Sequence, residues 1–185
     1  MTLFEYLMVM VALILGLGAT QILRGLARIA RSSRRYVVVT LWAVIFFYIA
    51  IQNWWALWDL NDLTRWDQGR YLFLIMLPCL LYGAIELLLP FNVPADMDWR
   101  SHFYSVRLWL FGVLSLYVVF AALQSWLLND ASLLHPYRVT QGGALLVALL
   151  GWATSHPAVH MWLPWVFIAL VGGGNLLYRL APASL

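Results

Sequence analysis

The chain has 185 residues, of which 64% are hydrophobic and only 10% are charged. Soluble globular domains are about 45–50% apolar and about 25% charged, so this composition excludes an ordinary water-soluble fold and indicates a chain surrounded by lipid. The formal net charge of +3 is too small to indicate a nucleic-acid-binding protein. All basic residues are arginine, which excludes Schiff-base chemistry on lysine, and the single cysteine, Cys79, excludes an internal disulfide.

Six apolar stretches predict membrane-spanning helices, since about 20 apolar residues cross the ~30 Å hydrocarbon core of a bilayer. Lipid offers no partner for unpaired backbone groups, and uninterrupted apolar runs are typical of helices rather than of barrel strands. Glu5 precedes the first stretch and arginines follow it, the reverse of a cleavable signal peptide, and this helix is expected to continue to Arg31. The predicted spans are residues 3–23, 36–58, 71–89, 108–128, 139–154 and 158–178.

The fifth stretch is shorter than the others, which leaves two architectures open. In the first, all six stretches cross the bilayer; in the second, five cross and residues 139–154 form a short re-entrant helix. The connections are short and contain turn-forming residues, so no part of the sequence is left for a soluble domain. We therefore predict an all-α, polytopic transmembrane helical bundle that forms a single domain over residues 1–185.

The first connection predicts the orientation of the chain, because cytoplasmic loops are the ones enriched in Lys and Arg. It carries five arginines and no acid, whereas the second connection combines three aspartates with two arginines. The sequence therefore predicts a multi-pass protein with its N terminus outside. Glu5, Arg179 and the tryptophans that end the second span are expected at the outer interface. The arginines are Arg24, Arg28, Arg31, Arg34 and Arg35, and the tryptophans are Trp54, Trp55 and Trp58.

The spacing of these arginines superficially matches a voltage-sensing helix, in which arginines recur every third residue through the membrane. Here, however, they begin only after the apolar run has ended. An arginine at the bilayer centre costs ~2.5–3.5 kcal/mol, whereas one beside anionic headgroups is favoured by ~1 kcal/mol. The pattern therefore favours contact with anionic lipids at the inner surface, and the alternatives are gating or the docking of a partner or an acidic loop.

Glu86 is the only acid deep inside an apolar run, where an ionised carboxylate is costly unless it is paired. Two roles are open: it pairs with Arg107 or Arg24 and holds helices in register, or it titrates in a path for protons or cations. Uncharged polar residues within the spans either form interhelical hydrogen bonds or line such a path. These candidates are Gln21, Gln52, Asn53 and Asn175, together with Thr20 and Gln124.

His156 and His160 have the i,i+4 spacing of zinc or haem ligands on a helix. Pro157 argues against a helix across both, and no cysteine or carboxylate lies nearby, so we interpret them as loop or interface histidines. The sequence has no nucleophile elbow, no glycine-rich phosphate loop and no paired carboxylates within a span. No metal or cofactor is therefore expected, and an enzyme is the least favoured class.

The opening FEYLMVMVALILGLGATQILRGLARIARSSRR, followed by WW..W at the end of the next span, resembles a recurring type of small, uncharacterised bacterial polytopic membrane protein. That type combines an acidic residue near the N terminus, an ILGLG…GL first helix and an arginine-rich first loop. The likeness covers roughly the first third of the chain. It implies a bacterial cytoplasmic (inner) membrane and no particular activity.

Two functions remain open from the sequence. Glu86, the glycine-rich spans and the polar residues within the bilayer favour a small oligomeric channel or transport-like protein. The lack of a soluble domain and the aromatic surface of the spans favour a non-enzymatic accessory or sensor subunit that docks a larger membrane complex. The expected partners are the lipid bilayer, including its anionic lipids, and either further copies of the chain or such a complex, with no nucleic acid.

Overall fold

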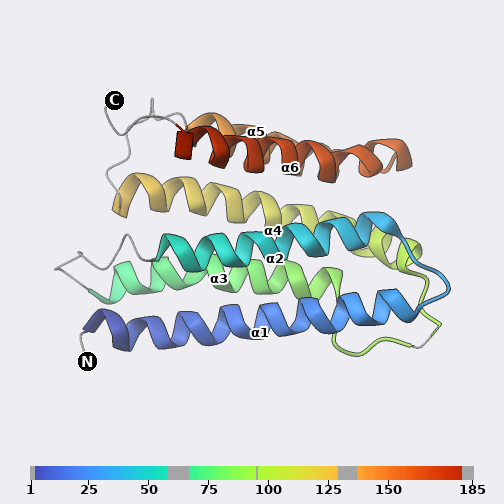
Figure 1. The fold of residues 1–185 in the computed structure, drawn as a ribbon, viewed down its shortest axis with the longest axis horizontal. Helices are drawn as coiled ribbons and strands as arrows, with labels where there is room; N and C mark the ends of the chain where they lie inside the picture. Colours follow the sequence, from blue (N-terminus) through green and yellow to red (C-terminus); the bar gives the residue numbers. More distant parts are fainter. Residues whose placement is uncertain (1–2, 58–66, 95, 129–136, 181–185) are drawn as a thin grey trace.

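The computed structural model describes residues 3–57, 67–94, 96–128 and 137–180, with the backbone alone at residues 3, 128, 137 and 175–180. Over these ranges, six helices run up and down in antiparallel order and form a bundle (Figure 1). The predicted all-α helical bundle is thus confirmed. The helices are α1 (Leu3–Arg31), α2 (Val37–Ala56), α3 (Gln68–Leu88), α4 (Trp99–Leu128), α5 (Tyr137–Ala153) and α6 (Pro157–Leu180).

Within the described ranges, α1, α2, α3, α4 and α6 are long and apolar enough to cross a membrane, so the chain is a multi-pass membrane protein. α5 has 17 residues, or about 25 Å of helix. It lies antiparallel along α4, because Arg138 at its start bonds to Ala122 and Gly151 near its end bonds to Arg107. A re-entrant segment would return to its starting level, so this arrangement favours the six-span architecture.

α4 begins at Trp99 rather than at residue 108. The Asp98 carboxylate caps this earlier start, accepting the backbone N–H of Arg100 at 2.9 Å and of Ser101 at 3.2 Å. Trp99 and Phe103 in the added turns are buried in the bundle, so core packing holds a segment whose polar residues interrupt the apolar pattern. The bounds of α2, α3, α5 and α6 lie within three residues of those predicted, and α1 continues to Arg31 as expected.

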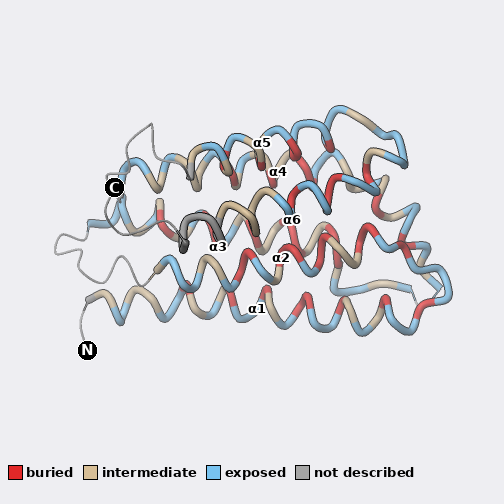
Figure 2. Tube along the Cα trace, turned by 45° about the horizontal axis from the view of Figure 1, so that its top comes forward, coloured by how far each residue is buried: buried red, intermediate tan, exposed pale blue. Residues whose placement is uncertain are grey.

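α2 packs against α1, α3, α4 and α6. It is apolar on every side, because its inward faces meet other helices and its outward positions, such as Val44 and Ile51 at 50% exposed each, face the surroundings of the bundle. Trp42 of α2 contacts the rings of Phe46, Phe111 and Phe167, with ring centroids 5.9, 5.4 and 5.5 Å apart, respectively. These four residues, here called the aromatic layer, fill the interior between α2, α4 and α6, and Figure 2 shows buried positions along the inward faces of the helices.

The connections gather at two ends of the bundle (Figure 1). One end carries the α1–α2 connection (32–36), the α3–α4 connection (89–98) and the α5–α6 connection (154–156), and we call it the arginine end. The other, here called the opposite end, carries the starts of α1, α3 and α5 and the end of α2. The arginine end is named for Arg24, Arg28, Arg31, Arg34, Arg35 and Arg100, which lie at or near it.

Candidate functional site

At the arginine end, α1 holds the end of α3 by two side chains that donate to backbone carbonyls. The Gln21 amide, only 5% exposed, donates to the carbonyl of Leu89. The Arg28 guanidinium donates to the carbonyls of Pro90 at 2.9 Å and Phe91 at 2.8 Å. These carbonyls belong to the first three residues after α3, where the chain has left the helix and offers no N–H four residues on to accept from in a helical turn. The contacts therefore replace the hydrogen bonds that a longer helix would have made.

Gly25 allows this approach, because it lies between Gln21 and Arg28 on the face of α1 that meets Leu89. A Cβ at Gly25 would lie 2.8 Å from Leu89 Cδ1 and 3.0 Å from its Cβ and Cδ2. Residues at i, i+4 and i+7 share one side of a helix, so a single face of α1 carries all three contacts. The sequence analysis interpreted Gln21 as a polar residue within the span and Arg28 as an arginine beyond it, and it indicated neither partner.

Glu86 of α3 also bonds to the α3–α4 connection. Its carboxylate accepts the backbone N–H of Phe91 at 2.9 Å, and its side chain is half-buried near the end of α3. Of the two expected ion pairs, neither forms among the described residues. The Arg24 guanidinium lies over the Phe91 ring, 5.8 Å from its centroid, and Arg107 bonds to α5 instead. The structure thus gives Glu86 a backbone partner in the connection that follows its helix, and not an arginine on another helix that would hold the two helices in register.

Arg107 joins α4 to the end of α5. One of its guanidinium nitrogens donates to the carbonyls of Gly151 at 3.1 Å, Trp152 at 2.8 Å and Thr154. A cation at a helix C terminus is favoured by the partial negative charge of the unpaired carbonyls there. Close packing accompanies the bonds, since a Cβ at Gly151 would lie 2.5–2.6 Å from the Phe111 ring.

His160 lies next to this contact and is completely buried. Its Nε2 donates to the Thr154 carbonyl at 2.8 Å, and its ring packs against Phe103, Tyr104 and Phe111 with centroids 5.3, 5.6 and 5.5 Å away, respectively. The interpretation of His160 as a loop or interface histidine is therefore wrong. His156 is exposed and precedes α6, and the described residues contain no group of three His, Cys, Asp or Glu side chains that could hold a metal ion.

A pair of tyrosine hydroxyls lies beside the same cluster. One belongs to Tyr36, which immediately precedes α2, and the other to Tyr104 of α4. The hydroxyls of Tyr36 and Tyr104 are 3.2 Å apart. Burial of Tyr36, together with its hydrogen bond to Tyr104, raises the pKa of the Tyr36 hydroxyl above its ordinary value of 10.0. The Tyr36 hydroxyl therefore stays neutral at physiological pH, and the pair acts as a polar contact between helices.

The remaining arginines of this end project outward. Arg31, Arg34, Arg35 and Arg100 are exposed, and we call them the arginine surface. Their local contacts leave them at the surface: Arg35 Nε donates to the Ser32 carbonyl at 2.9 Å, and the Arg100 guanidinium lies 5.9 Å from the centroid of the Tyr36 ring. Such a group of guanidinium cations is suited to phosphate groups, either of lipid headgroups or of acidic partners.

The opposite end holds the residues expected at the outer interface. Trp54 and Trp55 are 55% and 67% exposed, so both rings face the surroundings of the bundle. Glu5 is exposed, and Gln52 is half-buried on α2. Trp58 and the side chains of Asn175 and Arg179 lie outside the described residues.

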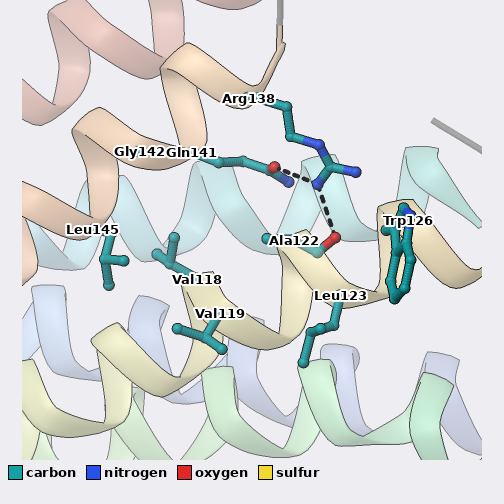
Figure 3. Close-up of a pocket in the computed structure, with 9 residues that line it drawn as sticks. All are labelled: Val118, Val119, Ala122, Leu123, Trp126, Arg138, Gln141, Gly142 and Leu145. Atoms are coloured by element: carbon teal, nitrogen blue, oxygen red, sulfur yellow. Dashed lines mark hydrogen bonds between the residues drawn. The ribbon is translucent and has the colours of Figure 1, made fainter. Parts of the chain in front are cut away.

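A groove of about 350 Å³ separates α4 from α5 near the opposite end. Figure 3 shows apolar side chains of both helices along it, and the Arg138 guanidinium donates to the Ala122 carbonyl at 2.8 Å and to Gln141 Oε1 at 2.9 Å. Sequence reasoning missed Arg138 and Gln141. Their i,i+3 spacing at the start of an apolar stretch was the one available signal, and it is common in helices. The groove is lined by Val118, Val119, Ala122, Leu123, Trp126, Arg138, Gln141, Gly142 and Leu145.

No protein-family model, curated protein or solved structure matches the chain significantly. The functional argument therefore depends on the contacts described above.

Proposed function

We propose that the chain is a non-enzymatic accessory subunit that docks a larger membrane assembly. The observation that supports this proposal best is that three polar side chains at helix contacts are bonded to the backbone of the bundle itself. Gln21 and Arg28 bond to the end of α3, and Arg107 bonds to the end of α5. Such groups hold helices together and present no polar face to a substrate or an ion.

The packing of the interior supports the same proposal. The aromatic layer fills the space between α2, α4 and α6, and the aliphatic residues Ile22, Leu81 and Ile85, each at most 2% exposed, lie in the core on the α1 and α3 side. A path for ions or water through one chain would have to cross these side chains. The surface available to a partner is widest on α4 and α6, since only 22% of the residues in the most apolar 18-residue stretch of each helix are buried.

We further propose that the arginine surface lies in the cytoplasmic leaflet of a bacterial inner membrane, with the N terminus outside. α1 supports this placement, since the residues before Arg24 provide about 30 Å of apolar helix and the arginines extend beyond it. Labelling tests the orientation: in a Cys79→Ser background, Ser33→Cys should react with a membrane-impermeant maleimide only after lysis, and Gln68→Cys, at an exposed position of the opposite end, in intact cells. The reverse pattern overturns the orientation.

Native mass measurement of the protein in mild detergent tests the docking. We expect a complex whose mass is larger than that of the 21.2 kDa chain and is not a whole-number multiple of it. Trp109 on α4 and Trp162 on α6 are 74% and 68% exposed, so Trp109→Ala and Trp162→Ala should reduce recovery of this complex. Trp55→Ala, at a 67% exposed position of the opposite end, is the matched control and should not. Recovery of monomers or homo-oligomers alone would contradict the proposal.

A small oligomeric channel is the second candidate, and its pore would have to run between copies of the chain. The half-buried Glu86 carboxylate favours it, because intramembrane acids commonly mark ion or proton paths. Proton and cation flux into liposomes should then be measurable for the parent protein and reduced in Glu86→Gln, with Glu5→Gln as the control. Absence of flux in the parent, or equal flux in both variants, discards the channel.

A further inference from the structure

A small cavity lies among α1, α2, α3 and α4, towards the opposite end. It leaves about 20 Å³ in which the centre of a water molecule fits. Most of its wall is apolar, including Val11 of α1, but three helices also bring polar groups or a proline to it. These are Asn53 from α2, Leu74 and Pro78 from α3, and Gln124 from α4.

Asn53 brings a hydrogen-bond donor to this cavity. The Tyr117 hydroxyl donates to Asn53 Oδ1 at 3.1 Å, and this bond sets the orientation of the amide. Asn53 Nδ2 is buried and has no hydrogen-bond partner among the described residues. A buried amide N–H without a partner is costly in an apolar environment, so this group requires an acceptor.

Gln124 brings the complementary group. Its Oε1 is buried and also has no partner in the described part of the chain. α3 adds a second acceptor, because Pro78 has no backbone N–H and cannot donate to the carbonyl of Leu74, four residues earlier. The residues that carry one donor and two acceptors thus come from three different helices and line one cavity.

We propose that a single ordered water molecule occupies this cavity and bridges α2, α3 and α4. It accepts a hydrogen bond from Asn53 Nδ2 and donates to Gln124 Oε1 and to the Leu74 carbonyl. A buried water needs roughly 10–15 Å³ of such space and two to four polar partners, and the cavity provides about 20 Å³ and three. A metal cation does not fit, because the amide N–H of Asn53 would face it, and a lipid chain is far too large.

The bridge has a structural consequence for α3. A proline inside a helix leaves the carbonyl four residues earlier without its hydrogen-bond donor, and it favours a local bend unless another donor replaces the missing N–H. Water is such a donor, and membrane helices commonly retain prolines by this means. The water molecule therefore satisfies the Pro78 position and links it to the polar side chains of α2 and α4.

A double-mutant cycle and a density map test the proposal together. Asn53→Leu and Gln124→Leu should each lower the unfolding temperature in detergent by several degrees, and the double variant should fall no further than the more severe single one. Gln52→Leu combined with Gln124→Leu is the control and should be additive, because Gln52 does not line the cavity. A map that resolves ordered water should show one peak between the two amides. Additive effects of Asn53→Leu and Gln124→Leu, or an empty cavity in the map, would overturn the proposal.

Discussion

The Arg107 guanidinium on α4 donates to the Trp152 carbonyl at the end of α5, over 2.8 Å. Because the same nitrogen also bonds to Gly151 and Thr154, one side chain holds the turn that joins α5 to α6. α5 packs against α4 and α6, and α6 reaches the rest of the bundle chiefly through α2. Arg107 is therefore one of the main polar links between the α5–α6 hairpin and the first four helices.

Replacing Arg107 should loosen this hairpin. We expect Arg107→Gln to lower the free energy of unfolding by about 2–3 kcal/mol, since hydrogen bonds to a charged group are worth about 1.5–3 kcal/mol and the carbonyls would be left partly unsatisfied. Arg107→Lys should have a smaller effect, because an ammonium keeps the charge and, like the single guanidinium nitrogen used here, can donate to several carbonyls. Thermal unfolding in detergent is the measurement, and Arg31→Gln, at an exposed position, is the control. Equal stability of Arg107→Gln and Arg31→Gln would show that the link contributes nothing.

The close approach of α1 to α3 can be tested with two glycines of the same helix. Gly25→Ala places a Cβ against Leu89, and overpacking of this kind costs about 1–3 kcal/mol. Gly16→Ala is the matched control, because a Cβ there meets nothing within 4 Å and alanine is the better helix former by about 1 kcal/mol. The two variants should therefore shift the unfolding temperature in opposite directions. A stabilised Gly25→Ala would mean that α1 and α3 are not held this closely in the protein.

The sequence was sufficient to predict the helices, because a segment that crosses lipid must be apolar along its length and must pair its own backbone groups. A continuous apolar run of about 20 residues has few alternatives in a bilayer, and the bounds of α2 and α3 follow directly from the runs. The start of α4 was missed because it does not depend on a continuous apolar run. Trp99 and Phe103 are buried by tertiary packing, which a hydropathy pattern interrupted by Arg100 and His102 does not indicate.

The contacts of the polar residues were far less predictable. Arg28 was interpreted from its charge as a lipid contact, yet it donates to carbonyls more than sixty residues away in the chain. Any backbone carbonyl is a potential partner, so composition and spacing carry no signal for such a bond. Glu86 shows the same limit, because the search for an opposite charge overlooked the backbone N–H of Phe91, only five residues along.

His160 should stabilise the bundle by packing and not by binding a metal. His160→Ala removes a completely buried ring from a cluster with Phe103, Tyr104 and Phe111, and we expect a loss of about 3 kcal/mol or more by analogy with other large-to-alanine core substitutions. His156→Ala should change stability by no more than about 0.5 kcal/mol, because that side chain is exposed. Adding Zn²⁺ should leave the unfolding temperature of the parent unchanged. A zinc-dependent rise that either substitution abolishes would establish a metal site instead.

Substitutions at Arg28 and at the arginine surface should have different effects on the unfolding temperature and on lipid preference. Arg28→Gln should lower the unfolding temperature, because the carbonyls of Pro90 and Phe91 lose their donor, and should leave lipid preference nearly unchanged. The triple variant Arg31→Gln, Arg34→Gln and Arg35→Gln should do the opposite, since each exposed arginine near anionic lipid contributes about 1 kcal/mol of attraction and makes few internal contacts. Lipid preference is measured from the phosphatidylglycerol retained in native mass spectra of nanodiscs that also contain phosphatidylcholine, and added salt should weaken the parent's preference. If Arg28→Gln alone reduced that retention, Arg28 would belong to the lipid-binding surface and its bonds to the α3–α4 connection would be secondary.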